Sequence, residues 1–181
     1  MRFFLWMKGR AAHLFASRQK PPPPSVIDSM SIRARVALGC TCLEKLCLEW
    51  GLLSGKMPGL LNALRAFTSS DRLDQWDGKV TALMPETPSE LLAMLEQEFV
   101  APQRLELLLE MLKAVHAIGG ENLYSGFVSE FTRLPTERVL ELLSKAEVPP
   151  PNLAPFVKST VLECGGWGKP HPATFYRDTK A

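Results

Sequence analysis

The sequence predicts an all-α fold: a single compact domain of about six or seven helices, preceded by a disordered basic N-terminal tail. Three observations lead to this prediction. Apolar residues recur at spacings of three and four, which is typical of one buried helical face. Helix start and stop signals, such as Ser, Thr or Pro before a segment and Gly after it, recur along the chain. Alternating β-branched runs are nearly absent, and residues 127–131 form the only short strand candidate.

The composition is that of an ordinary soluble domain. The chain has 181 residues, of which 46% are hydrophobic and 22% are charged, enough apolar material for one core. These values exclude a collagen-like repeat, a disordered acidic chain and a polytopic membrane protein. The formal net charge of +2 is too small for a dedicated nucleic-acid binder, which carries a large surplus of Lys and Arg. We therefore expect a cytoplasmic protein with no nucleic-acid partner.

The first 29 residues differ from the rest. They carry five basic residues and one acidic residue, so the +4 of this tail leaves −2 for residues 30–181. The apolar run at residues 3–7 is shorter than the roughly 7–15 residues of a secretory signal core or the roughly 20 of a membrane span. Four prolines at residues 21–24 favour an extended spacer. We expect residues 1–29 to be disordered or an annotation extension, with Met30 as the natural start.

Two other interpretations of the tail stay open. Its basic, acid-poor composition is also typical of an organelle-targeting segment. Residues 1–20 could instead lie on a membrane surface as an amphipathic helix anchored by Phe3, Phe4 and Trp6, which would make the protein a membrane-attached adaptor. The folded body itself gives no reason to expect membrane contact.

The first half of the body contains three predicted helices. Residues 31–50 show the apolar spacing of one buried face, with Ser31 as the N-cap. Residues 58–67 begin with a proline, which suits the first turn of a helix. Residues 73–83 show a third apolar face, although Gly78 weakens this helix by about 1 kcal/mol relative to Ala.

The second half contains four more segments. Residues 87–99 open with Thr-Pro-Ser-Glu, in which the Thr and Glu side chains can cap the first turn reciprocally. Residues 102–118 form the most apolar helix, which we expect at the centre of the fold and which two glycines should end. Residues 135–146 start with a proline and form another amphipathic helix. Residues 155–163 predict a shorter helix, and residues 165–181 predict a loop.

The four cysteines do not suit a metal site or a disulfide within the first helix. On a continuous helix Cys40 and Cys42 point about 200° apart, while Cys40 and Cys47 lie about 10 Å apart along the axis. Disulfide Cα atoms lie within about 7 Å of each other, and zinc needs its thiolates to converge on one point. We therefore expect reduced core thiols, no metal and no cofactor. Whether Cys164 meets one of the others stays open.

Catalytic motifs are equally scarce. His13 lies in the tail, His171 lies between two prolines, and His116 continues the polar stripe of its helix, where we expect it in solvent. The sequence contains no HExxH, GxSxG, P-loop or GxGxxG pattern. The chain is therefore not expected to be an enzyme.

Two loops look unlike generic helix connections. Residues 119–127 combine glycines with polar and aromatic side chains, and residues 165–170 place a tryptophan among glycines. Trp and Tyr often anchor interfaces, so both loops could contact a partner. Alternatively, they cover helix ends and the tryptophan plugs the core. The candidate partner-binding residues are Glu121, Asn122, Tyr124, Trp167 and Lys169.

Three short stretches carry a resemblance. Residues 30–35 (MSIRAR), residues 121–124 (ENLY) with 129–132 (SEFT), and residues 166–168 (GWG) resemble a group of small bacterial all-helical proteins. Some small helical proteins of this type accompany polymorphic toxins as candidate immunity proteins. The resemblance covers about residues 30–170, implies Met30 as the natural start, and supplies no binding residue.

The leading hypothesis is a non-enzymatic protein-binding module, an immunity-type inhibitor that acts by steric occlusion of a partner. The alternative is a small-ligand binder or an enzyme with a pocket between helices near Glu121, Tyr124 and His116. The membrane-attached adaptor described above is a third hypothesis.

Overall fold

The computed structural model describes residues 25–123 and 128–177. Within these residues the chain contains no β-strand, only an isolated antiparallel bridge between Met30 and Thr160, and the all-α prediction is confirmed. The described α-helices are α1 (Val26–Ser29), α2 (Ile32–Glu49), α3 (Met57–Arg65), α4 (Leu73–Leu83), α5 (Pro88–Leu95), α6 (Pro102–Gly120) and α7 (Ser129–Lys145). The described 3₁₀ helices are η1 (Ala66–Thr68), η2 (Phe156–Lys158), η3 (Cys164–Gly166) and η4 (Ala173–Tyr176).

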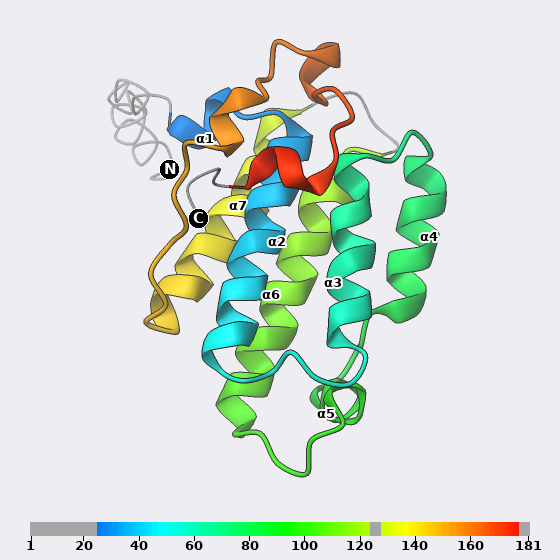
Figure 1. Ribbon diagram of the computed structural model, residues 1–181, viewed down its shortest axis with the longest axis vertical. Coiled ribbons are helices and arrows are strands. Elements are labelled where there is room, and N and C mark those ends of the chain that lie inside the picture. Colours follow the sequence, from blue (N-terminus) through cyan, green and yellow to red (C-terminus); the bar gives the residue numbers. More distant parts are fainter. Residues whose placement is uncertain (1–24, 124–127, 178–181) are drawn as a thin grey trace, which may run out of the picture.

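Helix α2 is the centre of the molecule (Figure 1), a position that we expected for the helix at residues 102–118. Thirteen of its eighteen residues are buried, and it packs against α3, α6 and α7. Small side chains explain this position because they let neighbours approach closely. A Cβ atom on Gly39 would lie only 2.9 Å from Cδ1 of Ile118 in α6.

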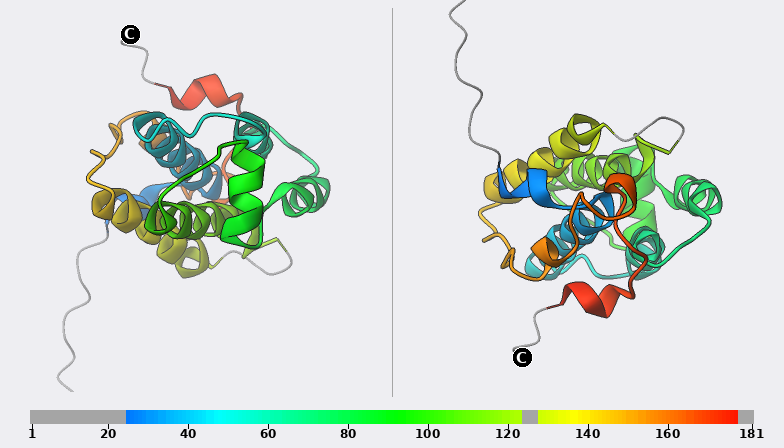
Figure 2. Two further views of the ribbon diagram at one scale, coloured as in Figure 1. Left: turned by 90° about the horizontal axis from the view of Figure 1, so that it is seen from below. Right: turned by 90° about the horizontal axis from the view of Figure 1, so that it is seen from above.

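The remaining helices surround α2. Helices α6 and α7 run in opposite directions and pack on each other, α3 lies beside α2, and α4 lies outside α3 (Figure 1). Helix α5 crosses the end of the bundle at which α6 begins (Figure 2). The chain after α7 returns along the bundle, and η4 lies against α2. Of the helices in the described part of the chain, none combines the length and hydropathy that spanning a bilayer requires.

Helix α6 continues two residues beyond its predicted end because its glycines serve packing. The Trp76 ring of α4 meets the Phe67 ring edge-on, with centroids 4.8 Å apart, and Nε1 of Trp76 donates a hydrogen bond to the Ala63 carbonyl (2.9 Å). A Cβ atom on Gly119 would lie 2.7 Å from Cη2 of Trp76 and 3.0 Å from Cε2 of Phe67. Gly119 therefore permits the contact between these aromatic rings and α6.

The packed body begins before residue 30, which corrects the expected boundary of the tail. Helix α1 contacts α7, and Ile27 in α1 is buried. The Ser25 amide donates a hydrogen bond to Oδ2 of Asp28 (2.8 Å), which closes the first turn of α1. Residues 25–29 therefore belong to the folded part of the chain.

Two further segments differ from the prediction. Helix α7 begins at Ser129, so Pro135 lies inside it, and residues 129–131 of the strand candidate are helical. Pro135 has no N–H group for the Phe131 carbonyl, but the packing of α7 on α2 and α6 outweighs this loss. The helix predicted at residues 155–163 is reduced to the single 3₁₀ turn η2, because the following residues extend to form the bridge with Met30.

Two buried arginines near the start of α2 hold distant segments together. Arg33 donates from Nε to the Gly168 carbonyl (3.2 Å), from Nη2 to the Ser70 carbonyl (2.9 Å), and from Nη1 to the Phe67 carbonyl. Its guanidinium also lies over the Phe67 ring, 5.6 Å from the centroid. Arg33 thereby joins the residues after α3 to the C-terminal segment.

Arg35 is completely buried and makes the corresponding connection to α1 and α7. Its Nε donates to the Ile27 carbonyl (3.1 Å), while Nη1 donates to the Ser129 carbonyl (2.8 Å) and to Oγ1 of Thr132 (2.5 Å). Burial lowers the pKa of Arg35 to about 10, so the side chain stays charged at neutral pH. The charge is stabilised by oxygen acceptors of the chain itself.

Candidate functional site

The loop after α6 is held closed by Asn122, which corrects the prediction that this residue contacts a partner. Asn122 is buried; its Nδ2 donates to the Val128 carbonyl (3.1 Å), and the Val128 amide donates to its Oδ1 (3.4 Å). The side chain therefore ties both ends of the loop together. Glu121 is exposed beside it. Tyr124 lies outside the described residues.

An apolar stripe follows this loop on the first turns of α7. Val128, Phe131 and Leu134 are 39%, 46% and 51% exposed. Residues three apart on a helix are neighbours on its surface, so the three side chains form one continuous surface. We call Val128, Phe131 and Leu134 the α7 stripe. Each member keeps a large apolar side chain in water, although the rest of α7 buries its apolar residues against the core.

Acidic residues gather around Arg133, on one flank of the α7 stripe, and we call this cluster the acidic frame. Arg133 lies 2.8 Å from the Glu137 carboxylate, 3.6 Å from Asp28 and 3.8 Å from Glu130. The hydrogen bond that Arg133 donates to Glu137 is the main reason that the pKa of Arg133 lies above its ordinary value. Two cations, Arg133 and the buried Arg35, thus face three carboxylates, and the frame carries a net charge of −1. This arrangement favours a partner with basic residues around an apolar centre.

Trp167 packs on the body, as the alternative in which the tryptophan covers the core describes. Its ring is half-buried and stacks on Phe67 with centroids 6.5 Å apart. The Trp167 carbonyl accepts a hydrogen bond from the Arg33 amide (3.2 Å). The next residue, Gly168, has φ +78°, and a Cβ atom there would lie 2.4 Å from Oγ of Ser31. The segment is therefore fitted tightly over the start of α2, whereas Lys169 is exposed.

His116 is half-buried, where the sequence predicts a solvated side chain. Its Nε2 lies 2.9 Å from Oδ1 of Asp77, and its ring lies 5.6 Å from that of Trp76. The pair borders an open depression that also includes Lys113 and Glu121. Polar groups do gather near His116, as the ligand-binding hypothesis requires, and the depression that they line is open to solvent.

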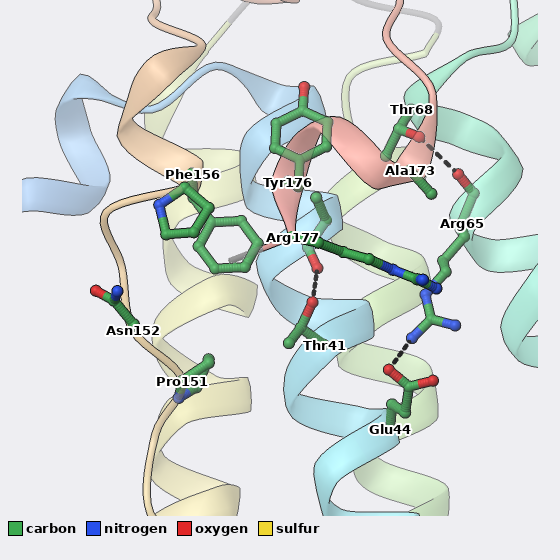
Figure 3. A pocket seen from close by; sticks show the side chains of 12 residues that line it. Thr41, Glu44, Arg65, Thr68, Pro151, Asn152, Phe156, Ala173, Tyr176 and Arg177 are labelled. Atoms are coloured by element: carbon green, nitrogen blue, oxygen red, sulfur yellow. Dashed lines mark hydrogen bonds and ion pairs between the residues drawn. The ribbon is translucent and has the colours of Figure 1, made fainter. Parts of the chain in front are cut away.

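A more enclosed cavity of about 180 Å³ lies between α2 and the C-terminal segment, away from His116 and Glu121 (Figure 3). The rings of Phe156 and Tyr176 form one wall. Arg65, which pairs with Glu44, and Arg177 stand at the other side, and in Figure 3 the Arg177 side chain extends toward Arg65. Sequence reasoning missed this cavity because its walls come from segments more than a hundred residues apart.

The cysteines form no shared site. Cys40, Cys42 and Cys47 are buried in α2, Cys164 is exposed, and all four are free thiols. Burial raises the pKa of each of the three buried thiols to about 12, so they stay protonated at neutral pH. Among the described residues, no group of three or more His, Cys, Asp or Glu side chains is placed to hold a metal ion.

No family model, no curated protein and no solved structure matches this chain.

Proposed function

We propose that the protein is a non-enzymatic protein-binding module whose contact surface is centred on the α7 stripe. The observation that carries this proposal is the exposure of Val128, Phe131 and Leu134 on one side of a helix whose other apolar residues are buried or packed against the core. Exposed apolar side chains gain free energy when a partner removes them from water, about 25 cal/mol per Å². Clustered apolar groups on an ordered helix are typical of interface centres.

The partner that fits this surface presents an apolar centre with Lys or Arg at its edge. The acidic frame supports this choice, since its three carboxylates outnumber its two arginines. The exposed carboxylate of Glu121 extends the negative charge to the start of the loop. Such a frame contributes mainly to the association rate and to the choice of partner, whereas the apolar stripe supplies affinity.

The mode of action that we propose is steric. The stripe belongs to a packed helical body, and a partner bound there would have its own surface covered by that body. Little ordering is needed on binding, because Asn122 and Arg35 already fix the start of α7. An immunity-type inhibitor of a cytoplasmic toxin is the specific form of this proposal that the sequence resemblance favours.

Site-specific photo-crosslinking in the native cells tests the proposal. The photoreactive residue p-benzoylphenylalanine replaces Phe131 in one variant and Phe99 in a matched control, because Phe99 is 76% exposed in the connection between α5 and α6. We expect a protein adduct of defined mass from position 131 and none from position 99. Adding Leu134→Asp should reduce the yield of that adduct at least tenfold.

A functional measurement completes the test. The crosslinked protein, purified separately, should lose its activity when the wild-type chain is added and keep it when Phe131→Asp is added. Equal adducts from positions 131 and 99 would contradict the proposal. Adducts from position 131 that contain only a second copy of this chain would also contradict it, because the stripe would then be a homodimer contact.

A further inference from the structure

We infer that the cavity between α2 and the C-terminal segment is a binding site for a small organic anion with a flat apolar body, of the size of an aromatic carboxylate. This inference is independent of the α7 stripe, because it concerns different residues. It rests on the volume of the cavity, the aromatic character of one wall and the cationic groups at the other.

The volume limits the ligand to a small molecule. The cavity measures about 180 Å³. For comparison, an engineered protein cavity of about 150 Å³ accommodates benzene. One aromatic ring with one charged substituent therefore fits this space.

The apolar wall suits a flat ring. Phe156 and Tyr176 are nearly parallel, with centroids 6.2 Å apart and an interplanar angle of 12°, and both residues are almost completely buried. Ala37 and Pro155 add further apolar surface. A ring in the cavity would exchange water contacts for contacts with these side chains, which favours an apolar ligand body.

The opposite wall selects the sign of the charge. Its charged side chains are Arg65, Arg177 and Glu44, and their sum is +1. Glu44 lies 2.5 Å from Nη2 of Arg65 and holds that guanidinium in place, with the Arg65 side chain only 16% exposed. Among the described residues, no carboxylate forms an ion pair with Arg177. A ligand carboxylate would therefore supply the missing countercharge, in the bidentate geometry that guanidinium groups favour.

The polar hydroxyl groups of the cavity support the same orientation. Thr41 donates its proton to the Ala37 carbonyl (2.9 Å), and Thr68 donates its proton to the Arg65 carbonyl (3.0 Å). Both hydroxyl protons are therefore engaged by the backbone. The guanidinium groups of Arg65 and Arg177 are the cationic donors of the lining, so the ligand's charged end should face them.

Titration of the full-length protein with benzoate tests the inference. The binding is followed by amide chemical shifts in ¹⁵N-edited NMR spectra, which also locate the probe. Benzylammonium, which has the same ring and the opposite charge, is the matched control ligand. We expect benzoate to shift the amides of residues 37–44, 65–68 and 173–177 in a saturable manner, and benzylammonium to leave them unchanged.

Two variants separate the cavity from general anion binding. Arg177→Gln removes the exposed cation and should weaken benzoate binding at least tenfold, whereas Arg72→Gln, at an exposed arginine outside the cavity, should leave it unchanged. Ala173→Leu fills part of the space and should reduce binding without removing charge. Shifts spread over the surface, equal shifts with benzylammonium, or equal affinity in Arg177→Gln would each overturn the inference.

Discussion

Two regions of the molecule reverse the usual placement of polar and apolar side chains. At the start of α2, Arg33 and Arg35 lie inside the protein, at 5% and 0% exposure. On the first turns of α7, Phe131 and Leu134 lie outside it. The two regions are close in the fold, since Arg35 donates a hydrogen bond to the Ser129 carbonyl at the start of α7.

The buried arginines and the exposed α7 stripe differ in whether the folded chain accounts for their placement. The buried arginines are explained by the fold, because each donates hydrogen bonds to several oxygen atoms of the chain itself. The exposed α7 stripe gains nothing comparable from the folded chain. A reversal that the fold itself accounts for is structural, and we propose that the one it leaves unaccounted for marks a surface that contacts another molecule.

The largest expected effect is that of removing a buried arginine. Arg35→Met should lower the free energy of unfolding by about 3–5 kcal/mol, because it removes the charge-assisted hydrogen bonds that the guanidinium donates to the Ile27 and Ser129 carbonyls and to the Thr132 hydroxyl. Urea unfolding followed by circular dichroism measures this loss. Arg72→Met, at an exposed arginine, should change the value by no more than about 0.5 kcal/mol. A loss below about 1 kcal/mol for Arg35→Met would show that the buried charge is not structural.

A second prediction concerns the packing around Trp76. Gly119→Ala should lower the free energy of unfolding by about 1–3 kcal/mol, because the new methyl group would collide with the Trp76 and Phe67 rings. Gly78→Ala, inside α4, has open space around it and should raise the same quantity by about 0.5–1 kcal/mol. Thermal and urea unfolding of both variants check the opposite signs. If both variants change the free energy of unfolding in the same direction, Trp76 of α4 does not pack against Gly119 of α6 as described.

The buried thiols of α2 predict a loss of stability at high pH. The pKa of Cys47 is about 12 in the folded protein against 9.0 for a free thiol, so the unfolded chain loses this proton first as the pH rises. The contribution of Cys47 is complete below pH 9 and declines above it, approaching about 1.4 kcal/mol per pH unit. The wild-type advantage over Cys47→Ala should therefore shrink between pH 8 and 10 in urea unfolding. A constant difference over this range would place the thiol in contact with water.

The sequence predicts much of the helical fold because the relevant signals are local. The Thr87 cap is an example: its hydroxyl accepts the Glu90 amide at 3.2 Å, as the spacing predicts. The reciprocal hydrogen bond differs from the prediction by one residue: the Glu90 carboxylate accepts from the backbone amide of Glu86 and not from that of Thr87. Helices α3, α4 and α6 likewise begin within a few residues of their predicted starts.

The start of α7 could not be predicted in the same way. Pro135 is a strong local start signal, but tertiary packing extends the helix six residues before it. Because Pro135 predicts the helix start, the residues before it are predicted as a loop, and the helical spacing of Val128, Phe131 and Leu134 is hidden. The cavity and the arginine contacts were inaccessible for a different reason: they join residues far apart in the sequence, such as Arg33 and Gly168.

The α7 stripe itself is tested most directly by its effect on stability. The double variant Phe131→Ser with Leu134→Ser should lose no more than about 1 kcal/mol, about 0.5 kcal/mol for each exposed position, because neither side chain is part of the core. Leu142→Ala, a buried leucine on the same helix, should lose about 2–5 kcal/mol in the same urea titration. If the double variant instead loses more than about 2 kcal/mol, the stripe serves the fold, and the proposal that it binds a partner is contradicted.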